Sequence, residues 1–127
     1  MTSDPDRALL ALADRVCAED LTETLLIEIR DAAFPAPRGY GGPYERWQHK
    51  IAAMGRLIRG GHYLEFAAGL LSARWSVLIH ADPEKCAVMV SLDFTDAKRK
   101  SYGSEAPTEP RARTAAALRA MAAEVGA

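Results

Sequence analysis

RWSVLIH (residues 74–80), CAVMVSLDF (residues 86–94) and EAPTEPRARTAAALRAMAAE (residues 105–124) are the segments that decide the fold of this chain. In the first two, apolar residues alternate with other residues, which is the period of a β-strand that buries one face. The turn signal ADPEK between them predicts an antiparallel hairpin. The third segment has a proline near its start and many alanines, and it predicts a closing helix over residues 110–124.

A hairpin alone is marginally stable, so the two strands need a third strand or a helical cover. HYLEFAA (residues 62–68) follows a Gly-Gly pair and supports two interpretations. Tyr63, Phe66 and Leu70 fit a helical stripe, whereas aromatic residues directly after a glycine turn are also typical of a strand. Periodicity alone slightly favours the helix, and both assignments stay open because Gly69 interrupts either one.

Three helices are predicted before this segment, over residues 4–17, 21–33 and 44–59. Pro5 suits the first turn of the first helix, because the N–H that proline lacks would be unpaired there. The second helix is expected to begin near Asp20, with a glutamate three residues later. The third has its apolar residues on one side, and a Gly-Gly pair ends it.

The composition indicates one domain over residues 1–127, with 49% hydrophobic and 26% charged residues. No apolar run approaches the roughly 18 residues that span a bilayer, and the N-terminal stretch does not resemble a secretory signal. The two cysteines, Cys17 and Cys86, fall in a predicted helix and a predicted strand, where reduced buried thiols are expected. We therefore expect a cytoplasmic protein that does not associate with membranes.

The net charge of −1 conceals an uneven distribution. Residues 1–34 carry eight acidic and three basic side chains, a local charge of −5. Residues 35–81 carry six basic and two acidic side chains, a local charge of +4. A converged basic patch would suit nucleic acid or an acidic protein, whereas solvated faces that neutralise one another would carry no function.

A loop rich in proline and glycine, FPAPRGYGGP (residues 34–43), precedes the basic third helix. Its spacing matches neither a P-loop nor a dinucleotide fingerprint, so it is interpreted as a connection that exposes an aromatic residue. Loops often carry binding residues. The candidate binding residues in the loop and helix are Arg38, Tyr40, Tyr44, Arg46, His49, Lys50, Arg56 and Arg59.

Metal and catalytic sites have weaker support. His80 with Asp82 and Glu84 offers one imidazole and two carboxylates, but structural zinc sites usually need four Cys/His ligands with characteristic spacing. No metal and no cofactor is therefore expected. Cys86 with a distant histidine is a conceivable nucleophile pair, although a strand cysteine normally packs inward.

The predicted hairpin would also allow Ser91, Asp93 and His80 to approach one another as a hydrolase-type group. No nucleophile-elbow motif accompanies them, so an enzyme is not favoured. A small hydrolase is kept as the least supported alternative.

The closing segment resembles that of the phage-type ABA-sandwich domains, small proteins of phages and prophages. LLALADRV (residues 9–16) and LTETLLIEIRDAA (residues 21–33) resemble the opening helices of that family. The resemblance implies helices on both sides of a small antiparallel sheet, and it favours a strand at residues 62–68. It implies no established activity. The matching residues of the closing segment are Ala106, Pro107, Thr108, Pro110, Ala112, Ala115–Ala117, Leu118, Arg119 and Ala120.

Together these observations predict an α+β fold, an α/β/α sandwich with an antiparallel meander of two to three strands covered by helices. The expected function is that of a phage or prophage accessory protein that binds a host or phage protein, for example as an inhibitor of a host or defence factor. The alternative is a small-ligand or nucleic-acid binder that uses the basic Arg38–Arg59 region. A homo-oligomer is compatible with either function.

Overall fold

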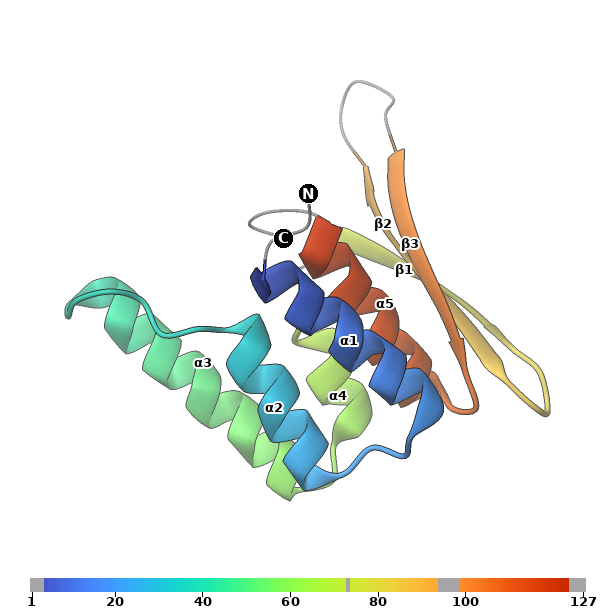
Figure 1. Cartoon of the computed structure of the whole chain (residues 1–127), viewed down its shortest axis with the longest axis horizontal. Coiled ribbons are helices and arrows are strands. Elements are labelled where there is room, and N and C mark those ends of the chain that lie inside the picture. The colour runs from blue at the N-terminus through green and yellow to red at the C-terminus, as the bar shows by residue number, and fades with distance from the viewer. Residues whose placement is uncertain (1–3, 73, 94–98, 124–127) are drawn as a thin grey trace.

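The computed structural model describes residues 4–72, 74–93 and 99–123, which form five helices and three strands (Figure 1). The residues outside these ranges include positions 94 and 124, at the ends of a predicted strand and a predicted helix. In chain order the elements are α1 (Asp4–Ala18), α2 (Glu23–Ala33), α3 (Gly42–Arg59), α4 (Tyr63–Ala68), β1 (Trp75–Ala81), β2 (Cys86–Asp93), β3 (Arg99–Ala106) and α5 (Glu109–Ala123).

The strands form one antiparallel sheet in the order β1-β2-β3, so the predicted meander and the α+β class are confirmed. Val77 faces Val90 across the first pair of strands. The hairpin closes where the Asp82 N–H donates to the Lys85 carbonyl at 2.9 Å. The Asp82 Oδ1 also accepts the backbone N–H of Lys85 at 3.0 Å, which is how an aspartate stabilises a tight turn.

The prediction of a strand at residues 62–68 was wrong, because this segment is helix α4 and the third strand is β3. Phe66 is fully buried in the core formed by the helices, where a helical stripe places it beside Leu70. β3 has the sequence RKSYGSEA, which contains few of the β-branched and aromatic residues that signal a strand. Pairing with β2 supplies the stabilisation that the local sequence of β3 lacks.

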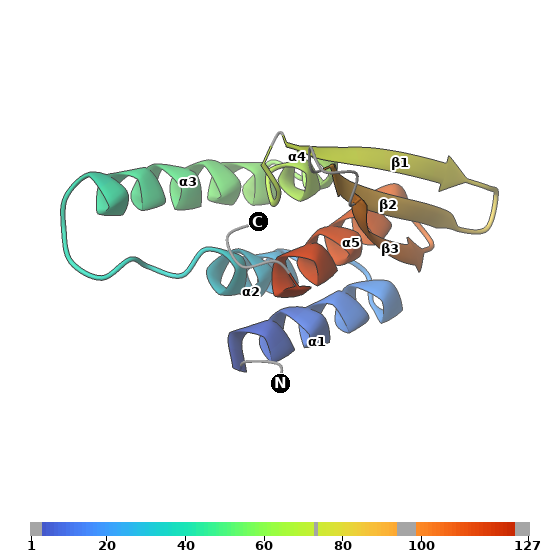
Figure 2. The same ribbon diagram turned by 90° about the horizontal axis from the view of Figure 1, so that it is seen from above.

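Helix α5 lies at the centre of the molecule, between the sheet and the other helices (Figures 1 and 2). Ala112, Ala116 and Ala120 recur every four residues, are fully buried, and pack against the sheet. Ala115 and Leu118 are buried on another side of α5, in the core with α1, α2 and α4. A helix buried on several sides must be apolar nearly all round, and alanine allows both layers to approach closely.

The order of the layers differs from the predicted α/β/α sandwich. All the described helices lie on the side of the sheet that α5 covers (Figure 2). On the other side Leu78 is 65% exposed and Met89 is 42% exposed. His80, Gly103 and Glu105 also lie on this outer face, and no described helix covers it.

An N-cap residue sets the start of α2 and shifts it from the predicted position. α2 begins at Glu23 rather than at residue 21, because the Thr22 Oγ1 accepts the Leu25 N–H and makes Thr22 the N-cap. The predicted start near Asp20 was therefore two to three residues early. No helix within the described ranges is long and apolar enough to cross a membrane.

A buried arginine joins α5 to the end of α1. Arg111 is 8% exposed, and its guanidinium donates to the carbonyls of Val16 at 2.9 Å and Cys17 at 3.0 Å. It also contacts the Asp20 carboxylate at 3.3 Å. The last carbonyls of a helix have no partner within it, and a cation there also suits the helix dipole. Arg111 is thus a structural residue and is not available to a basic surface patch.

Candidate binding surface

The loop before α3 and the first turns of α3 project from the molecule at the end opposite the sheet (Figures 1 and 2). Gly39 and Gly41 have φ values of 80° and 124° in this loop. Such positive values suit glycine because it has no Cβ. Pro43 follows in the first turn of α3, where its missing N–H costs nothing. The glycines and the proline of the loop therefore explain why the chain turns here and why α3 begins at Gly42.

Three aromatic rings follow one another at this end. The Tyr40 ring meets the Tyr44 ring edge to face at a centroid distance of 5.2 Å, and Tyr44 meets Trp47 at 5.5 Å. The Trp47 indole N–H donates to the Phe34 carbonyl at 2.7 Å and ties the row of rings to the end of α2. Tyr40 at the tip is 92% exposed.

Arginine side chains flank these rings. Arg38 and Arg46 are both exposed, and Nη1 of Arg46 lies back along the helix near Gly42. Neither arginine forms an ion pair within the described ranges. We call the surface formed by Arg38, Tyr40, Tyr44 and Arg46 the aromatic end.

The remaining predicted residues of α3 extend away from the aromatic end. Arg46, His49 and Arg56 are exposed and spaced by three and seven residues, so they share one side of the helix. At 1.5 Å per residue, Arg56 lies about 15 Å along the axis from Arg46. Arg59 is exposed at the last position of α3. The structure thus places the predicted residues along a stripe and brings only some of them together.

Lys50 has a structural role. Its ammonium donates to the Gly69 carbonyl at 2.7 Å, at the end of α4, and lies 5.1 Å from the centre of the Phe34 ring. The residue is half-buried. A cation held by a carbonyl and an aromatic face is largely satisfied within the chain. The prediction that Lys50 binds a partner gains no support from this geometry.

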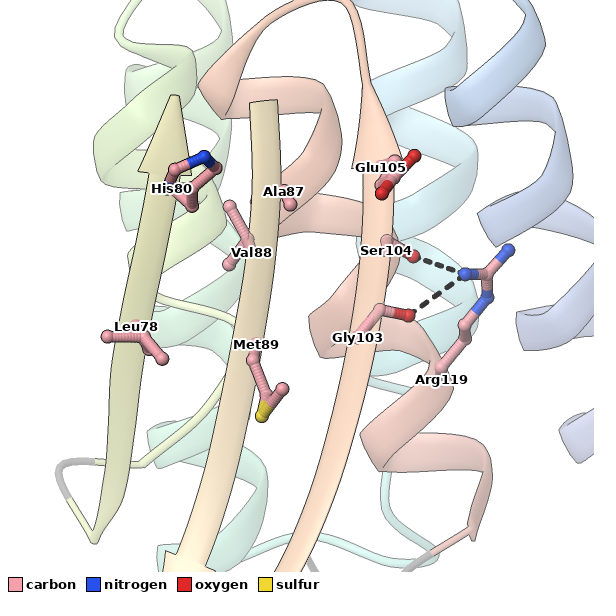
Figure 3. Close-up of a pocket in the computed structure, with 9 residues that line it drawn as sticks. All are labelled: Leu78, His80, Ala87, Val88, Met89, Gly103, Ser104, Glu105 and Arg119. Carbon is pink, nitrogen blue, oxygen red and sulfur yellow. Dashed lines mark hydrogen bonds between the residues drawn. The ribbon is translucent and has the colours of Figure 1, made fainter. Parts of the chain in front are cut away.

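A second candidate surface, a depression of ≈ 450 Å³, lies on the outer face of the sheet (Figure 3). Leu78 and Met89 form its apolar part. Gly103 on β3 faces Met89 across the strand pair and leaves the depression open, because it has no side chain. This surface was not predicted from the sequence, although Leu78 and Met89, which face each other across β1 and β2, are both apolar.

Arg119 borders the depression beside β3 (Figure 3). Its guanidinium donates to the Gly103 carbonyl at 3.0 Å and to the Ser104 hydroxyl, and it contacts the Asp14 carboxylate at 3.3 Å. These partners join α5 to β3 and to α1. They also use several of the donors that an anionic ligand would need.

The catalytic arrangements considered from the sequence are not formed. Ser91 faces Ser76, and His80 lies four residues further along β1, about 13 Å at the rise of a strand. The side chain of Asp93 lies outside the described residues. Cys86 packs into the inner core, whereas His80 lines the depression on the outer face. Burial also raises the pKa of the Cys86 thiol, so the reactive thiolate is disfavoured.

A metal site is also not formed by the residues that the structure describes. No three histidine, cysteine or acidic side chains converge among them. At the tip of the hairpin, Oδ1 of Asp82 accepts the backbone N–H groups of Glu84 and Lys85. The two cysteines are free.

Comparison with known proteins identifies no relative: no family model, no curated protein and no solved structure matches the chain. The similarity of the closing segment to phage-type sandwich domains stays a prediction.

Proposed function

We propose that this protein acts by binding another protein, and that the aromatic end is its contact surface. The observation that carries the proposal is Tyr40, a large aromatic side chain that is 92% exposed and held at a projecting tip by Tyr44. The few residues that dominate the binding energy of protein interfaces are enriched in tyrosine, tryptophan and arginine. A ring that is already positioned loses little conformational entropy when it enters a partner's pocket.

The charge of this surface suggests the kind of partner. Arg38 and Arg46 flank the rings, and Arg56 continues the basic side of α3. The whole chain carries a net charge of −1, so this region differs in sign from the protein as a whole. An acidic protein surface would be attracted to it and oriented by it. In the phage or prophage setting that the closing segment suggests, the partner would be a cytoplasmic host factor or another phage protein.

Single-stranded nucleic acid is the second candidate, because exposed aromatic rings beside arginines are also a stacking platform. Two observations favour a protein instead. Lys50 is bonded within the chain, and Trp47 is half-buried with its indole N–H occupied. Only the outer part of the aromatic row is therefore open to a base.

The proposal is tested by capture from the native host, followed by measurement of Kd with the purified partner. Tyr40→Ala is expected to weaken binding by at least about 10-fold, as at an interface hot spot. Arg59→Ala is the matched control at the opposite end of α3 and should change Kd less than about 2-fold. The proposal fails if Tyr40→Ala and Arg59→Ala bind the partner equally well.

A labelled single-stranded DNA of about 20 nucleotides separates the two candidates. Nucleic-acid binding would weaken steeply with added salt, because each neutralised phosphate releases counterions. Binding that is strong at about 25 mM salt, falls with salt, and is lost in Tyr40→Ala would replace the protein partner with nucleic acid. No binding at this salt concentration would exclude single-stranded nucleic acid.

A further inference from the structure

The two edges of the sheet are protected to different degrees. On the β3 side, Arg119 donates to the Gly103 carbonyl, and helix α1 packs against the strand. β3 also carries charged residues, which discourage pairing with another chain. On the other side β1, with the sequence WSVLIHA, contains no proline, lysine, arginine, aspartate or glutamate.

β1 is an exposed apolar edge. No described strand pairs with its free side, and Figure 2 shows β1 at the margin of the molecule with no described helix beyond it. Leu78 is 65% exposed on the outer face, and Ile79 is 40% exposed on the inner face. An uncharged, apolar edge strand with unpaired backbone groups is a template for another strand.

The backbone of β1 is arranged to accept such a strand. The Asp82 N–H bonds the Lys85 carbonyl across the hairpin, and bonded pairs alternate along an antiparallel ladder. Leu78 therefore directs its backbone groups toward β2. Val77 and Ile79 direct theirs away from the sheet, and their side chains lie on its inner face.

We propose that β1 pairs in antiparallel orientation with β1 of a second copy, about a two-fold axis at Leu78, to form a continuous six-stranded sheet. In this register Leu78 faces Leu78 of the second copy. Val77 faces Ile79 of the second copy, and these two residues exchange backbone hydrogen bonds. Each copy presents the same patch to the other, as a two-fold interface requires.

Charges at the two ends of β1 fit the same register. Arg74 precedes the strand and Asp82 follows it, and each lies opposite the other in the paired copies. Arg74 forms no ion pair within the described ranges. Asp82 uses Oδ1 for the turn, which leaves Oδ2 to accept from the arginine of the second copy.

Other registers fit less well. A shift by one residue would set an outer side chain opposite an inner one, which the pleat does not allow within one sheet. The nearest permitted registers are centred on Val77 or on Ile79. They place Leu78 opposite Ser76 or His80, so the most exposed apolar side chain of the strand would lose its apolar partner.

The association is expected to be weak. Two paired edge strands bury less than the roughly 1,600 Å² of a standard stable interface. We therefore expect a monomer–dimer equilibrium in the micromolar range rather than a permanent dimer. Sedimentation velocity over about 1–500 μM measures this equilibrium directly.

The first test compares two lysine variants on the same face of the sheet. Leu78→Lys places like charges opposite each other at the two-fold axis and should raise the dimer dissociation constant more than about 30-fold. Met89→Lys, one strand further in, is the matched control and should change it less than about 3-fold. Circular dichroism confirms that both variants fold. A monomer at every concentration, or equal effects of the two lysines, would overturn the proposal.

The second test reports the register. Residues opposite each other without mutual hydrogen bonds have Cβ atoms about 4.5–5.5 Å apart, close enough for a disulfide to form after a small adjustment. Leu78→Cys, in a Cys17→Ser background, is expected to form a disulfide-linked dimer under mild oxidation. Met89→Cys in the same background is expected to stay monomeric on a non-reducing gel. The register is wrong if Leu78→Cys does not cross-link at concentrations where the wild type is dimeric.

Discussion

The guanidinium of Arg111 on α5 is buried against the end of α1, whereas that of Arg56 on α3 faces solvent. Arg56 was a candidate binding residue from the sequence, whereas no sequence pattern marked the structural role of Arg111. Arg111 donates hydrogen bonds to the carbonyls of Val16 and Cys17 and to the Asp20 carboxylate. Arg56 has no ion-pair partner within the described ranges.

This difference teaches that a basic segment of sequence is not yet a basic surface. Two of the three arginines of α5 are used inside the chain: Arg111 caps the end of α1, and Arg119 joins α1 to β3. The arginines of α3 lie on a helix that packs through one side only, so their charges stay on the surface. Substitutions of Arg111 and Arg119 should change the stability of the fold, whereas substitutions of the exposed arginines of α3 should change binding.

The largest effect is expected for Arg111→Met, which keeps the aliphatic stem and removes the donors. The carbonyls of Val16 and Cys17 would then be left without their partner near a buried position. The free energy of unfolding should fall by about 2–4 kcal/mol, because unsatisfied buried polar groups are costly. Urea unfolding followed by circular dichroism measures the change.

Arg56→Met is the matched control for this experiment. An exposed substitution without buried partners should alter the free energy of unfolding by less than about 0.5 kcal/mol. Equal destabilisation by Arg111→Met and Arg56→Met would contradict the structural role of Arg111.

A smaller effect of opposite sign is expected at Thr114, three residues along α5 from Arg111. Thr114 is fully buried, and its hydroxyl has no hydrogen-bond partner among the residues that the structure describes. Thr114→Val replaces this hydroxyl with a methyl group of similar size. Because a buried unpaired hydroxyl is penalised, the variant should be about 1 kcal/mol more stable. A measured loss of stability would show that the hydroxyl does have a partner.

The smallest effect concerns Asp82 at the tip of the hairpin. Hydrogen bonds from the backbone N–H groups of Lys85 and Glu84 lower the pKa of this carboxyl from 3.8. A folded-state pKa below the unfolded one adds stability at pH values above 3.8, and this contribution is lost as the pH falls further. Asp82→Ala should therefore flatten the acid side of the stability–pH curve, measured by thermal unfolding between pH 2 and pH 6. An unchanged acid slope would show that the turn does not depend on the charged form.

The sequence predicted the elements that local pattern controls. α1, α3 and α5 have caps, prolines or glycine stops near their ends, and the structure begins and ends them within about two residues of the predicted positions. The hairpin of β1 and β2 was predicted from alternation and from its turn. These features depend on neighbours close in the chain, which the sequence displays directly.

β3 and α4 were missed for a physical reason. β3 is polar and contains Gly103, so no local signal marks it, and its pairing with β2 decides its structure. α4 has aromatic residues that suit a strand, but Phe66 is buried in the core formed by the helices, which holds the segment as a helix. Burial among distant residues overrides a weak local preference.

The candidate site divides in the same way. The exposed Tyr40 and the basic side of α3 were predicted from the loop and from the helical period. Three features were not predicted: the hydrogen bond from Lys50 to the Gly69 carbonyl, the capping of α1 by Arg111, and the unpaired edge of β1. Each depends on contacts between residues far apart in the sequence, and no local pattern records such contacts.

By itself, the sequence determined the α+β class, the amphipathic helices, the hairpin and the projecting aromatic loop. Local backbone preferences and the period of apolar residues suffice for these features. The tertiary structure alone decided that the described helices lie on one side of the sheet, that α5 is surrounded, and which cations remain exposed. Layer order and burial follow from how distant surfaces pack together, so they appear only when the whole chain is assembled.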